Sequence, residues 1–251
     1  MTQRVVVVTG ASGGIGLALS ELLASKGDTA VMVARRADQL KTAAKRCGAN
    51  AHPIVADMTK REEVRRVVSE TLQRHGRIDV WVNNVGRGIT REPSQLTDDD
   101  VDAMVETNVK SALYGMQEVL PHFKERNTGH VINVSSMLGR LAYATFRSAY
   151  TASKHFLNAL TISFRDEVKK THPGIQFSLV SPPVVRTDFG LNALHGGPDS
   201  RTLPNSQSAE DVAAVIVGVI ESRAPDVYTV QGSAERVAKY YASVGIDPPS
   251  R

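Results

Sequence analysis

Short apolar runs rich in valine and isoleucine alternate along this chain with longer segments in which apolar residues recur every three or four positions. Such a run is typical of a strand buried on both faces, and the intervening segments are typical of amphipathic helices. The alternation favours an α/β domain of the Rossmann type, doubly wound, with a seven-stranded parallel sheet flanked by helices on both faces. At 251 residues we expect a single domain, 1–251. The predicted strands are 4–8, 29–34, 51–56, 78–83, 130–134, 176–180 and 227–230.

Local signals mark the ends of several predicted helices. Gly27 follows an apolar stripe and is expected to end the first helix in a left-handed conformation. Thr97 precedes three aspartates, and Ser208 stands three residues before Asp211, so both are predicted N-caps with acids matched to the helix dipole. These signals agree with the helices that the periodicity predicts.

Four longer segments complete the predicted layout. Two long helices are expected at 98–125 and 148–171. The stretch 187–207 is rich in Gly, Pro, Asn and Ser and has no clear periodicity, and a loop of that length in a compact domain is usually functional. We therefore expect 187–207 to be a substrate-binding loop and 231–251 to be a C-terminal tail.

Composition excludes several classes of protein. The charge of +4 comes from Lys and Arg interspersed with Asp and Glu, so no nucleic-acid surface is expected. The seven histidines occur singly, and no metal site is expected. Cys47 is the only cysteine, so no intrachain disulfide is expected. No signal segment is expected because a predicted strand already begins at 4, and no membrane span is expected because the longest apolar run, 212–220, is too short. The cytoplasm is the expected compartment.

A glycine-rich loop, TGASGGIG at 9–16, joins the first predicted strand to the first predicted helix. Gly10, Gly14 and Gly16 leave room for a diphosphate to approach the backbone and the helix N-terminus. The alternative is that these glycines serve tight packing alone. The same letters also spell G-x-S-x-G around Ser12, the pattern of a serine hydrolase, with His195 as the nominated base. We rank that hypothesis lower because such an elbow normally follows several strands.

The residues after the second predicted strand favour one coenzyme. NAD sites place an acid there to bind the ribose hydroxyls, whereas NADP sites supply a basic group for the 2′-phosphate. The sequence reads Ala34, Arg35, Arg36, without an acid. A guanidinium can hold a phosphate through paired, charge-assisted hydrogen bonds, so NADP(H) is the predicted coenzyme. The alternative is that the two arginines are solvated residues at the start of a helix.

Candidate catalytic residues cluster in the second half of the chain. Tyr150 and Lys154 are four residues apart in a predicted helix, so both project from the same face. A nearby ammonium is expected to lower the pKa of the phenol. Ser135 and Ser136 follow a predicted strand and enter the crevice at the carboxyl edge of the sheet, where one hydroxyl can bind a substrate carbonyl. An isolated Tyr-x-x-x-Lys is also found in ordinary amphipathic helices.

Taken together, these segments resemble the short-chain dehydrogenase/reductase family over residues 4 to about 187. The resemblance rests on seven elements in family order and near family spacing. They are the TGxxxGxG loop, Asp57 after the third strand, NNVG at 83–86, Asn108 in a long helix, Ser136 before a glycine turn, Tyr150 with Lys154, and a proline-led segment after the sixth strand.

The resemblance implies a role for each matching residue. Tyr150 is the general acid/base, Ser136 assists it, Lys154 supports the tyrosine and binds ribose, and Asn108 holds a water in a proton relay. Asp57 receives the adenine amino group, Asn84 and Gly86 line the adenosine side, and Val185 and Thr187 hold the carboxamide. The implied coenzyme-binding set is Gly10, Ser12, Gly14, Ile15, Gly16, Arg35, Arg36, Asp57, Asn84, Gly86, Tyr150, Lys154, Val185 and Thr187.

Two departures from the family pattern bear on function. Pro182-Pro183 stands where the family usually has Pro-Gly, which removes a backbone N–H near the expected nicotinamide. The tail lacks the glycine-rich end of the acyl-carrier-protein reductases, so a carbonyl reductase acting on a small molecule is favoured over a 3-oxoacyl-thioester reductase. A nucleotide-sensing or scaffold protein on the same fold is the non-enzymatic alternative. The resemblance also implies a homodimer or homotetramer paired through the helices at 98–125 and 148–171.

Overall fold

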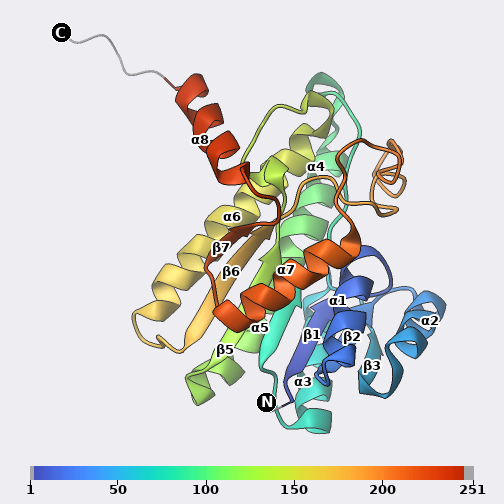
Figure 1. Cartoon of the computed structure of the whole chain (residues 1–251), viewed down its shortest axis with the longest axis vertical. Coiled ribbons are helices and arrows are strands. Elements are labelled where there is room, and N and C mark those ends of the chain that lie inside the picture. Colours follow the sequence, from blue (N-terminus) through green and yellow to red (C-terminus); the bar gives the residue numbers. More distant parts are fainter. Residues whose placement is uncertain (1–2, 246–251) are drawn as a thin grey trace.

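The computed structural model describes residues 3–245 and contains one seven-stranded sheet, all of whose neighbouring strands run parallel. The strand order is β3-β2-β1-β4-β5-β6-β7, so the chain starts in the middle of the sheet and builds outward in both directions (Figure 1). The predicted Rossmann-type α/β fold is confirmed. The strands are β1 Val5–Thr9, β2 Thr29–Ala34, β3 Ala51–Val55, β4 Val80–Asn83, β5 Gly129–Val134, β6 Ile175–Ser181 and β7 Asp226–Tyr228.

Helices cover both faces of the sheet because each central strand is apolar on both sides. All five residues of β1 are buried, and alternate valines belong to different cores. One core contains residues of α1 (Gly14–Ser25), α2 (Ala37–Cys47) and α7 (Ala209–Ser222). The opposite core contains residues of α3 (Arg61–His75), α5 (Ser111–Arg126) and α6 (Ser148–Lys169). Burial on two faces removes far more apolar surface from water than a one-sided sheet of this size can.

The predicted helix ends agree with the structure. Gly27 has φ +86 directly after the last residues of α1. Thr97 caps α4 (Asp98–Val105) in a full capping box. The Thr97 hydroxyl accepts from the Asp100 backbone N–H, and the Asp100 carboxylate accepts from the Thr97 backbone N–H. Ser208 accepts from the Asp211 N–H at the start of α7. Short polar side chains therefore satisfy backbone donors that the helix leaves free.

Two predictions of element bounds need correction. The long helix expected at 98–125 is not one regular α-helix, because a π-helical turn, Glu106–Lys110, separates α4 from α5. A π-turn inserts one extra residue into the helical path and is often found at functional sites. The last strand ends at Tyr228, earlier than predicted, because the chain then turns toward α8 (Ser233–Val244).

The C-terminal segments are less enclosed than the sheet. Helix α8 projects from the body of the molecule, with one buried residue, Ser233 (Figure 1). The predicted loop 187–207 has turns and single bridging residues but no helix or strand. Residues 246–251 of the predicted tail lie outside the described residues.

The remaining elements are short 3-10 turns at Gly48–Asn50, Pro93–Gln95, Met137–Gly139 and Thr145–Arg147.

Candidate active site

The carboxyl edge of the sheet gathers the residues that the sequence singled out. The glycine loop follows β1, Asn84 follows β4, Ser136 lies two residues beyond β5, and Pro182 follows β6. In a doubly wound sheet the strand order reverses next to β1, and the crevice there is the usual place for a nucleotide. The order of the strands thus brings together residues that are about 170 positions apart in the chain.

The glycine loop lies close to its neighbours, as a coenzyme cradle requires. Gly10 and Gly14 adopt left-handed conformations, with φ of +67 and +53. A Cβ on Gly16 would lie 2.4 Å from the Gly10 carbonyl oxygen, so only glycine allows α1 to start this close to the loop. Gly13 has open space where its Cβ would lie. The loop therefore leaves the start of α1 accessible to an anion, and the residues present fit the predicted diphosphate.

The guanidinium groups of Arg35 and Arg36 lie near the carboxyl ends of β1 and β2. The Arg36 Nη2 donates a 3.5 Å hydrogen bond to the Ser12 Oγ of the glycine loop. The Arg35 Nη1 lies 3.9 Å from the Asp57 Oδ2, with the Arg35 side chain 66% exposed. The other Asp57 oxygen, Oδ1, accepts from the backbone and hydroxyl of Thr59, which fixes the carboxylate. Arg35, Arg36, Ser12 and Asp57 thus form a group that the chain brings together from three segments.

Asn84 is committed to the glycine loop. Its side-chain amide donates to the carbonyls of Thr9 and Gly10, at 3.0 and 3.3 Å. Its backbone N–H donates to the Thr9 hydroxyl. These bonds hold β1 and β4 together at the crevice and keep the Gly10 turn in place. The predicted contact of Asn84 with adenosine stays a prediction, and the structure adds this positioning contact to it.

The structure separates the two candidate serines. The Ser135 Oγ donates a 2.5 Å hydrogen bond to the Asn158 Oδ1 and is part of the packing between β5 and α6. Ser136 has an extended backbone, and its hydroxyl accepts from the Leu138 N–H while it also contacts Tyr150. Ser136 is therefore the serine that faces the predicted proton donor.

Tyr150 is buried, with 7% of its surface exposed, and its surroundings favour the protonated phenol. Burial raises the pKa of Tyr150 to about 12, although hydrogen bonding to Ser136 and the charge of Arg147 both act to lower it. The sequence predicted the opposite direction from the Lys154 ammonium. The reason for the difference is that the Lys154 Nζ lies 5.8 Å from the centre of the tyrosine ring, and burial of the phenol outweighs the charges around it.

Lys154 is also enclosed. Its Nζ donates a 2.9 Å hydrogen bond to the Val134 carbonyl at the end of β5. Burial lowers the pKa of Lys154 to about 8, so the ammonium is the main form at neutral pH but is close to losing its proton. A Cβ on Gly86 would lie 3.6 Å from this Nζ and 3.4 Å from the Asn108 Oδ1. Gly86, Asn108 and Lys154 therefore line the same part of the crevice.

Asn108 is fully buried in the π-helical turn. Its Oδ1 accepts from the Arg87 N–H at 2.8 Å, and its Nδ2 donates to the Arg87 carbonyl and to the Ser153 hydroxyl. The Asn108 side chain thus bonds both backbone groups of Arg87, as a neighbouring strand would, directly after the NNVG segment. Its predicted role in a water relay stays a prediction, because these contacts use the groups that would hold the water.

The segment after β6 reaches the glycine loop despite the double proline. The Pro182 carbonyl accepts from the Met137 N–H, and Val185 pairs with Gln207 in an isolated parallel bridge. The Thr187 methyl carbon would lie 3.1 Å from a Cβ on Gly14. Thr187 therefore borders the glycine loop, and its predicted contact with the nicotinamide carboxamide stays a prediction.

Sequence reasoning missed two residues of this crevice. The Phe189 ring lies edge-on to Tyr150, with 5.6 Å between the ring centres, and it also borders Gly86. Arg147 is three residues before Tyr150 and contributes a positive charge to its surroundings. Phe189 is a lone aromatic in a segment without periodicity, so no pattern singled it out. Only its spacing from Tyr150 could have pointed to Arg147.

Comparison with known proteins decides the family. A family model described as short chain dehydrogenase matches residues 4–195. The chain belongs to the short-chain dehydrogenase family. An uncharacterized oxidoreductase of Staphylococcus saprophyticus is 34% identical to it over 194 residues, which cover 74% of this chain and 80% of the relative.

Solved structures resemble this short-chain dehydrogenase over nearly its whole length. A short-chain dehydrogenase/reductase from Burkholderia phymatum in complex with NAD has a TM-score of 0.88, with 99% of this chain and 98% of that chain covered; at 22% identity it shows the fold alone. The closed form of a serine dehydrogenase complexed with NADP⁺ is 27% identical, with a TM-score of 0.80 and coverage of 89% and 92%. The two complexes contain different coenzymes, NAD and NADP⁺, so the likeness does not distinguish between them for this chain.

The serine hydrolase alternative does not fit this short-chain dehydrogenase. His195, the nominated base, donates or accepts a 2.7 Å hydrogen bond through Nε2 with the Asp100 Oδ1, at the start of α4. Asp100 also binds Arg91 at 2.7 Å, and bonding to His195 holds the pKa of Asp100 far below its usual range. Ser12 contacts Arg36 instead. The pair of His195 and Asp100 anchors the 187–207 loop rather than activating a serine.

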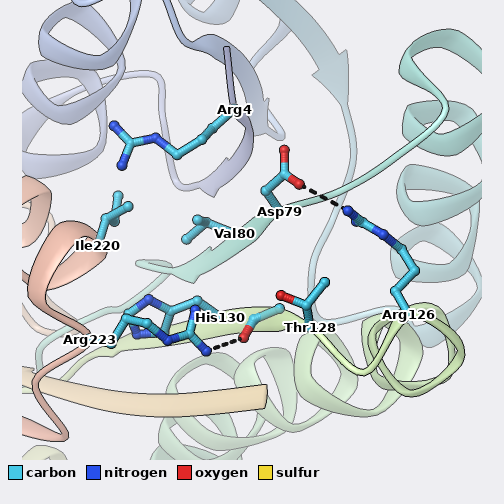
Figure 2. Close-up of a pocket in the computed structure, with 9 residues that line it drawn as sticks. Arg4, Asp79, Val80, Arg126, Thr128, His130, Ile220 and Arg223 are labelled. Carbon is cyan, nitrogen blue, oxygen red and sulfur yellow. Dashed lines mark hydrogen bonds and ion pairs between the residues drawn. The ribbon is translucent and has the colours of Figure 1, made fainter. Parts of the chain in front are cut away.

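A hollow of about 150 Å³ lies at the opposite, amino-terminal edge of the sheet. Figure 2 shows arginines around it whose charges are used in structural contacts. Arg126 pairs with Asp79, and Arg223 donates to the Gly129 carbonyl at 3.0 Å. His130, buried among them, has its pKa lowered to about 3 by burial and is neutral. These contacts hold the starts of β4 and β5 against the ends of α5 and α7.

Residues 3–245 offer neither a metal site nor a membrane-spanning helix. In this part of the chain, no three His, Cys, Asp or Glu side chains lie close enough together to hold a metal ion. Among the described helices, none combines the length and the apolar character that crossing a bilayer requires.

Proposed function

We propose that this short-chain dehydrogenase is an NADP(H)-dependent carbonyl reductase that interconverts a carbonyl and a secondary alcohol of a small molecule. The observation that carries the proposal is the meeting of Ser136, Tyr150 and Lys154 at the carboxyl edge of the sheet, beside a glycine loop that can accept a diphosphate. Reduction is the proposed physiological direction, because a tyrosine whose pKa is raised to about 12 holds its proton at neutral pH and can donate it.

The side chains divide the chemistry among themselves. The coenzyme supplies the hydride. Tyr150 Oη donates its proton to the substrate oxygen, and the Ser136 hydroxyl donates a hydrogen bond to the same oxygen, where negative charge develops. The Lys154 ammonium stabilises the phenolate that Tyr150 becomes. The Phe189 ring, in contact with Tyr150, excludes water from the reacting groups.

Arg35 and Arg36 support NADP(H) over NAD(H). The two guanidinium groups lie at the end of β2, where a ribose 2′-phosphate is held in this fold. No carboxylate stands at 34–36 to repel a phosphate or to bind the ribose hydroxyls. Asp57 and Ser12 contact these arginines and would hold them in place beside the phosphate.

The Tyr150→Phe variant tests the proposal. It removes one hydroxyl and keeps the ring that packs on Phe189, so turnover should be lost while the affinity for NADPH stays within about threefold of the parent. NADPH oxidation is measured against simple ketones, sugars, quinones, steroids and acyl thioesters. Turnover by the variant contradicts the mechanism. A parent protein that binds NADPH but reduces no carbonyl compound favours the nucleotide-sensing or scaffold alternative, and a preference for acyl thioesters favours the 3-oxoacyl-thioester reductase.

We also propose a homodimer or homotetramer paired through α5 and α6. The exposed sides of these helices border a hollow in which three apolar residues, Leu120, Pro121 and Phe164, lie among the polar residues Arg61, Gln117, Lys124 and Glu167. Burial of apolar surface of this kind drives subunit association. Light scattering at micromolar concentration gives the mass directly, and a monomer contradicts the proposal.

A further inference from the structure

Arg147 is a half-buried cation that no carboxylate neutralises among residues 3–245. Its Nη1 donates a 3.0 Å hydrogen bond to the Ile89 carbonyl, which is its one protein acceptor in this part of the chain. Burial lowers the pKa of Arg147, and the charge that acts in the other direction is that of Tyr150. A guanidinium removed from water without a counter-ion costs free energy, so this position favours an anion from outside the chain.

The carboxylates of the 187–207 loop and of the start of α4 bind other groups. Asp188 and Asp199, the two carboxylates of the 187–207 loop, contact Arg201 at 3.1 and 2.7 Å. Asp100 is bound at the start of α4, as described above. These carboxylates are thus bound to other cations, and none of them is a partner of Arg147.

A second polar group near Arg147 also has no partner. The Thr90 Oγ1 is buried and makes no hydrogen bond within the described part of the chain. The Thr90 Oγ1 and the Arg147 Nη2 each lie 3.0 Å from the point that a Cβ on Gly197 would occupy, and the Gly190 carbonyl oxygen of the 187–207 loop lies 2.7 Å from it. A guanidinium and a free hydroxyl therefore converge beneath the 187–207 loop. Both can donate hydrogen bonds to the same anion.

One aromatic ring separates this pair from the reacting centre. The Phe189 ring faces Tyr150 on one side, with 5.6 Å between ring centres. On another side it borders Gly88, where a Cβ would lie 3.1 Å from the ring and 2.8 Å from the Arg147 Nη1. Tyr150, Phe189 and Arg147 are consecutive neighbours along one wall of the crevice. A small molecule with its carbonyl at Tyr150 can therefore reach Arg147 with a group only a few bonds away.

We infer that Arg147 and Thr90 bind an anionic group of the substrate, a carboxylate in the simplest case, so that the chain reduces short oxo acids in preference to neutral ketones. The inference rests on the proposed carbonyl reduction and names its substrate class. Arg147 holds the carboxylate through its planar fork of donors, and Thr90 adds the bond that its hydroxyl lacks in the protein. With the anion fixed at this end, the carbonyl carbon is held at a constant distance from Tyr150.

Matched pairs of substrates test the inference. The values of kcat/KM are measured with NADPH for acetoacetate against methyl acetoacetate, and for 4-oxopentanoate against its methyl ester. Dihydroxyacetone phosphate against dihydroxyacetone tells whether the site takes a phosphate instead. The parent enzyme should prefer the anionic member of at least one pair. Arg147→Gln should lower kcat/KM for that anion roughly ten- to a hundredfold more than it lowers kcat/KM for the neutral partner, which feels only the loss of the Arg147 charge near Tyr150.

Thr90→Val separates binding of the anion from support of the fold. The hydroxyl has no protein partner, so valine of the same shape should leave the melting temperature unchanged or raise it, while the preference for the anion falls severalfold. Arg236→Gln, which removes one positive charge from the exposed face of α8, is the control for net charge and should leave the preference unchanged. Arg147→Lys should restore part of the preference, because the charge returns without the fork.

Each opposite result has a distinct meaning. Equal losses for the anionic and the neutral substrate in Arg147→Gln overturn the inference and assign Arg147 to support of the loop. A parent enzyme that reduces neutral ketones as well as their anionic partners also overturns it, while leaving the proposed reduction intact. Failure of the parent to reduce any member of the pairs or of the broader carbonyl panel, with NADPH bound, contradicts the proposed function itself.

Discussion

The ammonium of Lys154 donates a 2.9 Å hydrogen bond to the carbonyl of Val134, at the last residue of β5. This contact fixes the direction of the lysine side chain before any other molecule binds. It does not offset the cost of enclosing the charge, because burial lowers the pKa of Lys154 from 10.5 to about 8. In the proposed mechanism Lys154 is thus a residue that function requires, and burial of its charge lowers stability.

Replacing Lys154 with methionine should raise stability while abolishing activity. Keeping the buried ammonium protonated at pH 7 costs on the order of 3 kcal/mol, which methionine, of similar length, does not incur. We expect the melting temperature of Lys154→Met to exceed that of the parent by several degrees, measured by calorimetry at pH 7.

The same variant has a pH signature. The folded-state pKa of about 8 lies below the ordinary value of 10.5, so between these values the unfolded chain binds more protons than the folded one. Stability of the parent therefore rises with pH across this window, and the advantage of Lys154→Met should shrink as pH rises from about 8 to 10. Lys169→Met, at the exposed end of α6, is the matched control and should show no such trend. A lower melting temperature for Lys154→Met at pH 7 contradicts the argument.

The rate of reduction should depend on pH through Lys154 rather than through Tyr150. Tyr150, with its pKa raised to about 12, keeps its proton at all working pH values. Lys154 loses its charge above about pH 8, and the phenolate that forms during turnover then lacks its cation. The value of kcat/KM for carbonyl reduction should stay level from about pH 6 to 7.5 and fall above pH 8. A profile that falls on the acid side instead assigns the titration to another group.

Two glycines of the same loop should differ in how far alanine lowers NADPH affinity. A Cβ on Gly16 meets the Gly10 carbonyl oxygen at 2.4 Å and the Asn84 amide at 2.7 Å, so Gly16→Ala must displace the glycine loop from α1. Gly13 has nothing within 4 Å of its Cβ position and an extended backbone, so Gly13→Ala fits. We expect Gly16→Ala to lower NADPH affinity at least tenfold and Gly13→Ala to change it by less than about threefold. Fluorescence titration of NADPH measures both, and equal effects contradict the geometry.

Coenzyme choice should follow the charge at the end of β2. Arg35→Ala should cost roughly ten- to a hundredfold in NADPH affinity and little in NADH affinity, because one charge-assisted contact is lost. Ala34→Asp with Arg35→Ile should invert the preference, since the carboxylate binds ribose hydroxyls and repels a phosphate. Arg46→Ala, an exposed arginine of α2, controls for charge. Equal losses of both coenzymes in Arg35→Ala, or tighter binding of NADH by the parent, contradict the assignment.

The sequence predicted the fold, and it brought the candidate catalytic side chains to one edge of the sheet, because both depend on local patterns. Continuous valines in β1, the caps at Thr97 and Ser208, and the spacing of Tyr150 and Lys154 are each visible within a few residues. The parallel arrangement of the strands then follows from the alternation of strands and helices, since parallel strands require crossovers.

What the sequence did not predict depends on contacts between distant segments. The π-turn contains Asn108, whose side chain accepts a hydrogen bond from the Arg87 N–H, 21 positions away. The direction of the Tyr150 pKa depends on burial by residues such as Phe189, which no spacing rule connects to it. The isolation of Arg147 is visible only when the partners of nearby carboxylates are known.

The central place of β1 has a consequence for synthesis on the ribosome. Within the sheet, β1 leaves the exit tunnel before its neighbours, and β2 can pair with it soon afterwards, but its other neighbour, β4, begins only at Val80. Until then the nascent chain presents the VVVV edge of β1 without a partner, and an unpaired apolar edge can associate with other chains. A chaperone bound until β4 has been synthesised should therefore raise the yield of folded protein more than later assistance does.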